Sequence, residues 1–147
     1  MPATDGLCIF DIVICITKTQ KIMEVKNNPV NWFEIAVTDL DRAKKFYGAV
    51  LQTEFQDLEM GPTKMAMFAM DPEKSGAGGS LLLADEAKPS ADGTTIYFQC
   101  DDVTNESGRV EANGGKIVFP KMDIGEFGFV AQFMDTEGNR IGLHSNQ

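Results

Sequence analysis

The alternation of apolar and polar residues predicts a strand, a helix and three further strands in the first half of the chain. Residues 31–37 are mostly aromatic or aliphatic, which is typical of a strand. Residues 39–51 follow as a helix, opened by the capping pair Thr38 and Asp41. Its apolar positions recur at helical spacing and form one buried face: Leu40, Ala43, Phe46, Tyr47 and Val50. Three strands are expected next, at residues 53–60, 64–70 and 80–84.

The second half repeats this order of elements. A strand is predicted at residues 94–100 and a helix at 105–112, ended by Gly114 and Gly115. Strands near 116–120, 127–135 and 139–145 complete the set. The second helix is the weaker of the two, because Gly108 in its middle costs about 1 kcal/mol in helix propensity.

Two short motifs occur twice at nearly the same offset. Val37-Thr38-Asp39-Leu40 corresponds to Cys100-Asp101-Asp102-Val103, 63 positions later, and Met70-Asp71-Pro72-Glu73 corresponds to Met134-Asp135-Thr136-Glu137, 64 positions later. Two matches at one period indicate a duplicated unit. We therefore expect an α+β fold of tandem βαβββ modules, at 29–84 and 94–145, within a single domain covering 29–147. A ligand is expected where the two half-barrels meet.

The charge of the chain restricts its partners. With 22 acidic and 13 basic residues among 147, the net charge is −9, which disfavours nucleic acid and anionic membrane surfaces. A small organic molecule is the expected partner. The three cysteines, Cys8, Cys15 and Cys100, lack metal-type spacing and leave an odd thiol, which favours a reducing cytoplasm.

Residues 1–28 precede the repeat and are interpreted as an N-terminal extension. The apolar run Cys8–Ile16 is interrupted by Asp11, follows no basic residue and is too short to span a bilayer, so we do not expect a signal peptide or a membrane span. Two hypotheses stay open for this extension. It is either an added edge strand or the product of an upstream start codon, since Met23 lies just before the repeat.

Three sequence features together resemble one family. They are the helix start Asp39-Leu40-Asp41-Arg42-Ala43, the pair Phe46-Tyr47, and the closing run from Asp135 to Leu143. This combination resembles the vicinal oxygen chelate (VOC) superfamily of glyoxalases, bleomycin-resistance proteins and ring-cleaving dioxygenases. The resemblance covers residues 29–145 and implies paired βαβββ modules around a cleft. It also implies a homodimer and a divalent metal bound by the first and last strands of each module.

The ligand positions implied by the resemblance carry unsuitable residues. They fall on Trp32, Thr95 and Gly142, and Ser80–Leu82 brackets the fourth. An indole, a neutral hydroxyl and a glycine cannot replace imidazole and carboxylate ligands, so we expect no metal cofactor. The chain also has a single histidine, which rules out the two-histidine, one-carboxylate iron set of dioxygenases.

Glu34 and His144 are the candidate catalytic residues. Each follows a vacated ligand position by two residues, so strand alternation places it on the same face, about 7 Å along. They could form an acid–base pair for proton transfer beside a carbonyl, or half of a shifted metal site. A structural interpretation is also open. His144 would then be a surface or hydrogen-bonded residue, and Glu34 would be satisfied by backbone donors, Arg42 or Arg140.

Two functions remain compatible with the sequence. The first is a lyase or isomerase acting on a small oxygenated metabolite through Glu34 and His144. The second is a non-catalytic protein that sequesters an apolar or aromatic compound, with Trp32 and Tyr97 as stacking surfaces. The candidate substrate-binding residues are Trp32, Thr95, Tyr97, Gln99, Phe68 and Phe133. Cys100 has the opposite strand parity to Thr95, which predicts a buried, unreactive thiol.

Overall fold

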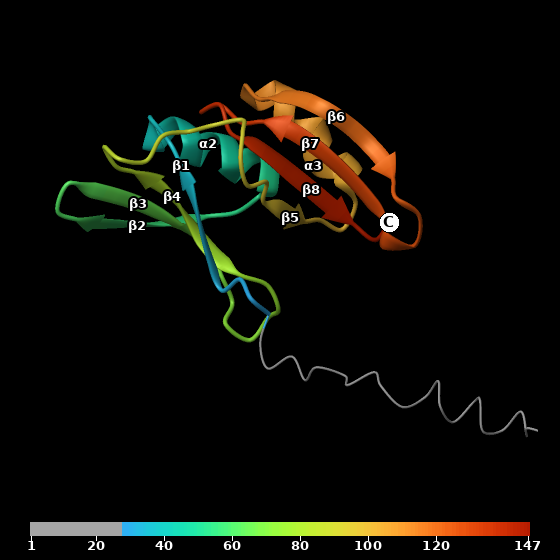
Figure 1. The fold of residues 1–147 in the computed structure, drawn as a ribbon, viewed down its shortest axis with the longest axis horizontal. Coiled ribbons are helices and arrows are strands. Elements are labelled where there is room, and N and C mark those ends of the chain that lie inside the picture. The colour runs from blue at the N-terminus through green and yellow to red at the C-terminus, as the bar shows by residue number, and fades with distance from the viewer. Residues whose placement is uncertain (1–27) are drawn as a thin grey trace, which may run out of the picture.

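A computed structural model describes residues 28–147, which form two four-stranded sheets and two α-helices (Figure 1). The elements of the first module are β1 (Trp32–Ala36), α2 (Leu40–Leu51), β2 (Phe55–Met60), β3 (Thr63–Phe68) and β4 (Gly78–Leu83). Those of the second are β5 (Tyr97–Gln99), α3 (Val103–Val110), β6 (Lys116–Asp123), β7 (Phe129–Met134) and β8 (Arg140–Ser145). Two 3₁₀ turns, η1 (Glu111–Asn113) and η2 (Gly125–Phe127), flank β6. The hypotheses about Cys8–Ile16 concern residues outside this range.

The two sheets have the same topology. Their strand orders are β1-β4-β3-β2 and β5-β8-β7-β6, and in each the first strand of the module runs parallel to the last. The other neighbouring pairs are antiparallel. This shared strand topology confirms the predicted tandem of βαβββ modules.

Both helices begin at aspartate caps. The Asp39 carboxylate accepts a hydrogen bond from the Arg42 amide at 2.9 Å, and Asp102 plays the same part for α3 through the Thr104 amide at 2.8 Å. The prediction that Thr38 caps the first helix was therefore wrong by one residue. The second helix also begins two residues before its predicted start and ends as the 3₁₀ turn η1.

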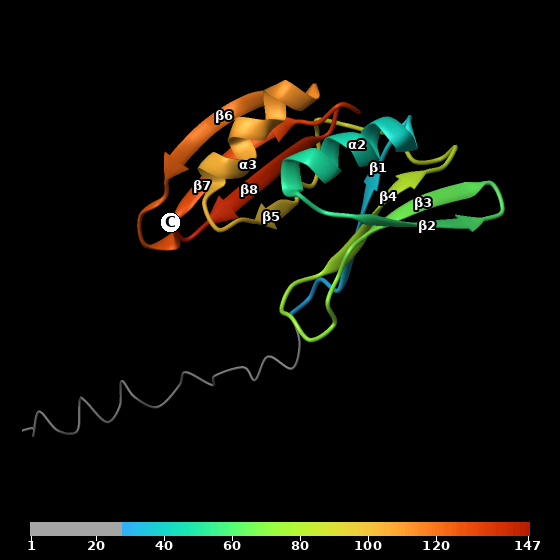
Figure 2. The same cartoon turned by 180° about the vertical axis from the view of Figure 1, so that it is seen from behind.

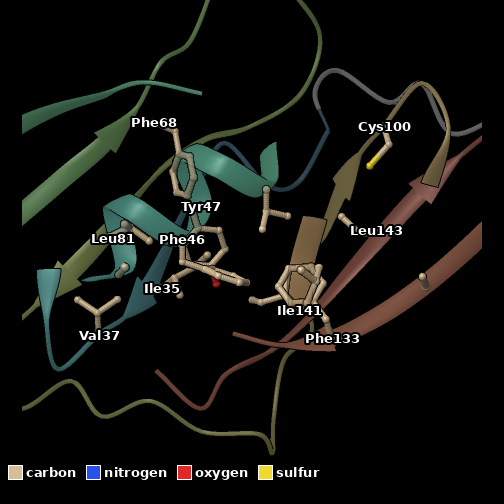
Figure 3. Packing of buried hydrophobic residues seen from close by; sticks show 14 of the residues in the cluster. Ile35, Val37, Phe46, Tyr47, Phe68, Leu81, Cys100, Phe133, Ile141 and Leu143 are labelled. Atoms are coloured by element: carbon tan, nitrogen blue, oxygen red, sulfur yellow. The ribbon is translucent and has the colours of Figure 1, made fainter. Parts of the chain in front are cut away.

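The helices pack side by side on one face of the sheets, and the hydrophobic core lies beneath them (Figure 2). Figure 3 shows this core from close by, with Phe46 and Tyr47 of α2 among strand residues of both modules. The rings of Phe46 and Tyr47 meet edge to face at 5.1 Å between centroids. One hydrophobic core is thus shared by both modules.

A polar network joins the modules at the loop between β7 and β8, residues 135–139. Tyr47 donates a hydrogen bond from its hydroxyl to Asp135 at 2.6 Å, and Asn139 donates from its side chain to the Ala36 carbonyl at 2.8 Å. Glu137 accepts from the amide of Asp39 at 2.9 Å. We call this contact between the 135–139 loop and the start of α2 the sealed junction.

Candidate functional site

A pocket of about 850 Å³ lies at the other meeting point of the modules. Its walls come from β1, the loop before β4, β5 and the two helices. Apolar and aromatic side chains predominate in the lining: Val30, Trp32, Phe33, Leu51, Phe68, Ala69, Met70, Ala77, Ile96, Tyr97 and Phe98. A concave, largely aromatic pocket with few polar groups is the usual form of a small-molecule site.

Loop length explains why this meeting point stays open. The β3–β4 loop occupies residues 69–77, whereas its counterpart in the second module, the β7–β8 loop of the sealed junction, occupies only 135–139. Within residues 28–147, the longer loop makes no hydrogen bond to the second module. This loop lines the pocket, as β5 does, and does not join the two modules there. We call this region the open junction.

Glycines let aromatic rings lie against the first sheet at the open junction. A Cβ atom at Gly78 would come within 2.8 Å of the Met70 sulfur and 3.2 Å of the Trp32 ring. At Gly79 it would come within 2.5 Å of the Phe33 ring. A side chain at Gly79 would displace the Phe33 ring, and one at Gly78 would require Met70 and Trp32 to shift, so the two glycines allow these side chains to lie close to the strand.

The structure places five of the six predicted substrate-binding residues in the pocket lining: Trp32, Phe68, Thr95, Tyr97 and Gln99. Phe133 is not among them. Its side chain is fully buried beneath the helices, where its ring lies 5.7 Å from that of Phe46. Phe133 lies away from the pocket because its position in β7 points it toward the helices, as the buried neighbour Ala131 on the same face shows.

Trp32 and Tyr97 are the most accessible aromatic residues of the lining, at 38% and 46% exposure. The Tyr97 ring lies directly over Gly142, where a Cβ atom would collide with it. Its hydroxyl accepts a hydrogen bond from the Gln132 side chain at 2.5 Å. These two contacts fix Tyr97 against the second sheet, while nearly half of its surface stays exposed.

Glu34 lines the pocket and is exposed. Its strand neighbour Ile35 is the buried one, because the helices cover that face of β1 and leave the Glu34 face open. Within the described chain the Glu34 carboxylate has no hydrogen bond or ion pair.

His144 is held by other partners and does not line the pocket. Its Nδ1 lies 3.2 Å from the Gln99 side-chain oxygen, and its Nε2 lies 2.7 Å from the Phe127 carbonyl oxygen. The structure thus does not bring Glu34 and His144 together as a hydrogen-bonded pair.

The family's metal positions do not fit a divalent ion in this chain. Trp32 and Thr95 supply no imidazole or carboxylate, and the space beside Gly142 is filled by the Tyr97 ring. Ser80, within the bracket expected for the fourth ligand, offers only a buried hydroxyl. Among residues 28–147, no cluster of three or more histidine, cysteine, aspartate or glutamate side chains is placed to hold a metal.

Glu106 is a pocket residue that the sequence analysis missed. Its side chain is 16% exposed, and one oxygen accepts from the Arg109 guanidinium at 3.1 Å. Among residues 28–147 the other, shielded oxygen faces only the weak donor of the nearby Cys100 thiol. Arg109 also donates to the Val50 carbonyl at 2.8 Å, which ties α3 to the end of α2. The signal was present in the spacing, since Glu106 follows the buried Val103 by three positions and shares its helix face.

Cys100 lies near this carboxylate and is buried, as predicted. Burial raises the pKa of the Cys100 thiol to about 12, and the negative charge of Glu106 adds to the effect. The thiol therefore stays protonated at neutral pH and is a poor nucleophile. The polar part of the pocket accordingly consists of carboxylates, hydroxyls and an amide.

Comparison with known sequences gives a consistent result. The sequence model of the Glyoxalase/Bleomycin resistance protein/Dioxygenase superfamily matches residues 30–143. CFP32 of Mycobacterium tuberculosis, a protein with a glyoxylase name, is 29% identical over 126 residues, which cover 84% of this chain and 48% of that protein. A glyoxylase-like domain-containing protein of Didymella fabae is 30% identical over 119 residues, covering 78% of this chain and 91% of that protein.

Solved structures show the same fold. Glyoxalase I from Zea mays superposes with a TM-score of 0.61 at 19% identity, over 78% of this chain and 45% of the maize chain. TnmS3, an antibiotic-binding protein from Streptomyces, superposes with a TM-score of 0.59 at 25% identity, over 84% of this chain and 99% of TnmS3. The chain thus spans about half the length of the mycobacterial and maize relatives and nearly all of TnmS3.

Proposed function

Because this chain belongs to the Glyoxalase/Bleomycin resistance protein/Dioxygenase superfamily, we propose that it is a binding protein that sequesters an aromatic or largely apolar small molecule at the open junction. The observation that carries the proposal is the replacement of the family's metal ligands by binding surface. Trp32 stands at one ligand position, and the Tyr97 ring covers the position of another at Gly142. Aromatic faces bind flat, apolar molecules and do not bind divalent metals.

The similarity to TnmS3 supports a binding role. TnmS3 is an antibiotic-binding protein, and the likeness extends over nearly its whole length. The catalytic alternative, a lyase or isomerase with Glu34 and His144 as base and acid, receives less support. His144 is engaged by Gln99 and Phe127, and Glu34 lies outside its hydrogen-bonding distance.

The chain carries its own reporter of binding, since Trp32 is its only tryptophan and lines the pocket. Titration with a panel of fused-ring aromatic compounds is expected to change Trp32 fluorescence saturably, with one site per chain. Each bound compound should be recovered unchanged by mass spectrometry after prolonged incubation. Conversion of a bound compound into a product would contradict the proposal and favour the lyase or isomerase alternative.

A pair of variants locates the site. Trp32→Ala removes a pocket wall and should weaken binding, measured by calorimetry, by about tenfold or more, because the stacking of one aromatic ring contributes about 1–2 kcal/mol. Phe127→Ala is the matched control, since Phe127 is 67% exposed and lies outside the pocket lining. Equal affinities for the two variants would place the ligand elsewhere.

We further propose that the protein is a homodimer. Large apolar side chains are exposed on the uncovered faces of both edge strands, Leu58 and Met60 on β2 and Phe119 and Met122 on β6. Exposed apolar patches of this kind commonly mark protein interfaces. Light scattering coupled to gel filtration should give twice the mass of one chain. The variant Phe119→Glu/Met122→Glu should give the mass of one chain if the β6 face is the interface.

A further inference from the structure

The charged side chains that line the pocket at the open junction are all acidic. Its lining includes two carboxylates, Glu34 and Glu106, and contains no lysine, arginine or histidine. The whole chain carries a net charge of −9, which adds a negative field around the opening. An anionic ligand would meet repulsion and no counterion there, whereas a cation would meet attraction.

Glu34 is the carboxylate best placed to receive a cation. It lies on β1 two residues from Trp32, so the two side chains leave the same face of the strand about 7 Å apart. Within residues 28–147 it forms no ion pair, in contrast to Glu137 and Glu106, which are paired with arginines. A carboxylate without a counterion on an aromatic wall is the arrangement that recognises alkylammonium groups.

The aromatic side chains strengthen this preference. Trp32 and Tyr97 both expose ring surface, and both belong to the face of the strands that the helices leave uncovered. A cation within about 6 Å of such a ring centroid gains about 0.5–2 kcal/mol. Glu106 adds a second acceptor, because among residues 28–147 one of its oxygens faces only the weak donor of the Cys100 thiol, and a ligand N–H group would be a stronger one.

We propose that the ligand of this pocket is an amphiphilic molecule with an aromatic or apolar body and a protonated amine, and that Glu34 is the counterion of that amine. This inference rests on the proposed binding function and specifies its ligand class. The ring system would lie against Trp32 and Tyr97, with the ammonium group toward Glu34. Molecules of the same shape with a carboxylate in place of the amine would be excluded.

Three compounds with one ring system test the inference by calorimetry at neutral pH and low salt: 2-(2-naphthyl)ethylamine, 2-(2-naphthyl)ethanol and 2-naphthylacetate. The amine is expected to bind about tenfold more tightly than the alcohol, and the carboxylate more weakly than either. Raising the salt concentration should reduce the advantage of the amine. In Glu34→Gln the ratio of amine to alcohol affinity should fall to near one.

Glu59→Gln is the matched control. Glu59 is an exposed strand carboxylate outside the pocket, so its replacement should leave the amine preference intact. Binding of the alcohol without any preference for the amine would overturn this inference while the proposed binding function stands. Retention of the full preference in Glu34→Gln would overturn the role of Glu34. Failure of all three compounds to bind at millimolar concentration would overturn the inference and contradict the proposed function for this ligand class.

Discussion

At the scale of single residues, Glu137 connects the two modules through hydrogen bonds and an ion pair. Its side chain is shielded from solvent, and it accepts hydrogen bonds from the backbone of Thr38 and Asp39 and from the Arg42 guanidinium. Burial alone would raise the pKa of Glu137, but these donors outweigh it and lower the pKa to about 2. The carboxylate also lies at the start of α2, where the helix dipole favours a negative charge.

Replacement of Glu137 by glutamine should destabilise the protein. The folded-state pKa of about 2 lies below the ordinary value of 4.5, so the ionised form contributes stability that is fully present above about pH 4.5 and is lost as the pH falls toward 2. A shift of this size corresponds to about 3 kcal/mol. Urea unfolding at pH 7 should show a loss of about that amount, and the variant should lose less stability than the parent between pH 5 and pH 3.

The first module supplies a control for this experiment. Glu73 occupies the matching place in the repeated motif, but it is exposed on the long loop of the open junction. Glu73→Gln should therefore leave the free energy of unfolding within about 0.5 kcal/mol of the parent. Equal losses for the two variants would show that Glu137 does not stabilise the sealed junction.

Gly142 should not tolerate even one added carbon. Alanine at this position would push the Tyr97 ring away from the sheet, which we expect to cost about 1–3 kcal/mol and to weaken ligand binding. The Tyr97→Ala background removes the obstacle. The same Gly142→Ala change should there be nearly neutral for stability, and an unchanged cost in that background would refute the contact as its cause.

At the residue scale, strand alternation predicted only part of the pocket. It gave Tyr97 and Gln99 the same parity as Thr95, and all three line the pocket, but so do Ile96 and Phe98 of the opposite parity. Alternation also placed His144 at the cleft, where the structure does not have it, and it could not say which face of β1 the helices would cover. The Gln99 and Phe127 oxygens that bind His144 lie 45 and 17 positions away in sequence, and no local pattern indicates such contacts.

At the scale of elements, the order of strands and helices was predictable, whereas their ends were less so. The β5 strand is confined to Tyr97–Gln99, although residues 94–100 read as strand. Thr95 lies before its start and lines the pocket instead. The cap of α2 was misplaced because Thr38 and Asp39 are both good capping residues. Only the tertiary contact of Thr38 with Glu137 decides between them.

The α3 helix should gain stability from a single substitution. Gly108 lies in its middle with ordinary helical geometry, and a Cβ atom there would meet no other atom within 4 Å. Gly108→Ala should therefore raise the free energy of unfolding by about 0.5–1 kcal/mol. Urea unfolding measures the gain, and a loss of stability would contradict this description of α3.

Gly114 is the opposite case and serves as the comparison. It ends η1 with a φ of 94°, in the left-handed region that favours glycine. Gly114→Ala should lower the free energy of unfolding by about 1 kcal/mol or more. Measured together, the two alanine variants separate helix propensity from backbone strain.

At the scale of the whole molecule, duplication predicted the architecture but not its asymmetry. The repeated motifs indicated two modules, and the common topology confirms them. The difference between the two junctions depends on which contacts a loop makes after folding. Residues 71–73 and 135–137 read alike in sequence, yet only the second set binds the other module.

Metal analysis tests the molecule as a whole. The purified protein should contain far less than one zinc, iron, manganese or nickel ion per chain by elemental analysis, because the family's ligand positions carry Trp32, Thr95 and Gly142. One tightly bound metal ion per chain would contradict this expectation. Its loss in His144→Ala would then support the shifted metal site considered for Glu34 and His144.

The unequal lengths of the two inter-strand loops have an evolutionary consequence. The short loop carries contacts on which folding depends, so few changes to it are compatible with a folded protein. The long loop makes no such hydrogen bonds to the second module and borders the pocket, so we expect mutations there to alter ligand preference at little cost in stability. Selection for a new ligand preference can therefore proceed without compensating mutations that restore stability. We expect libraries randomised at residues 71–77 to yield folded proteins with new ligand preferences far more often than libraries randomised at residues 135–139.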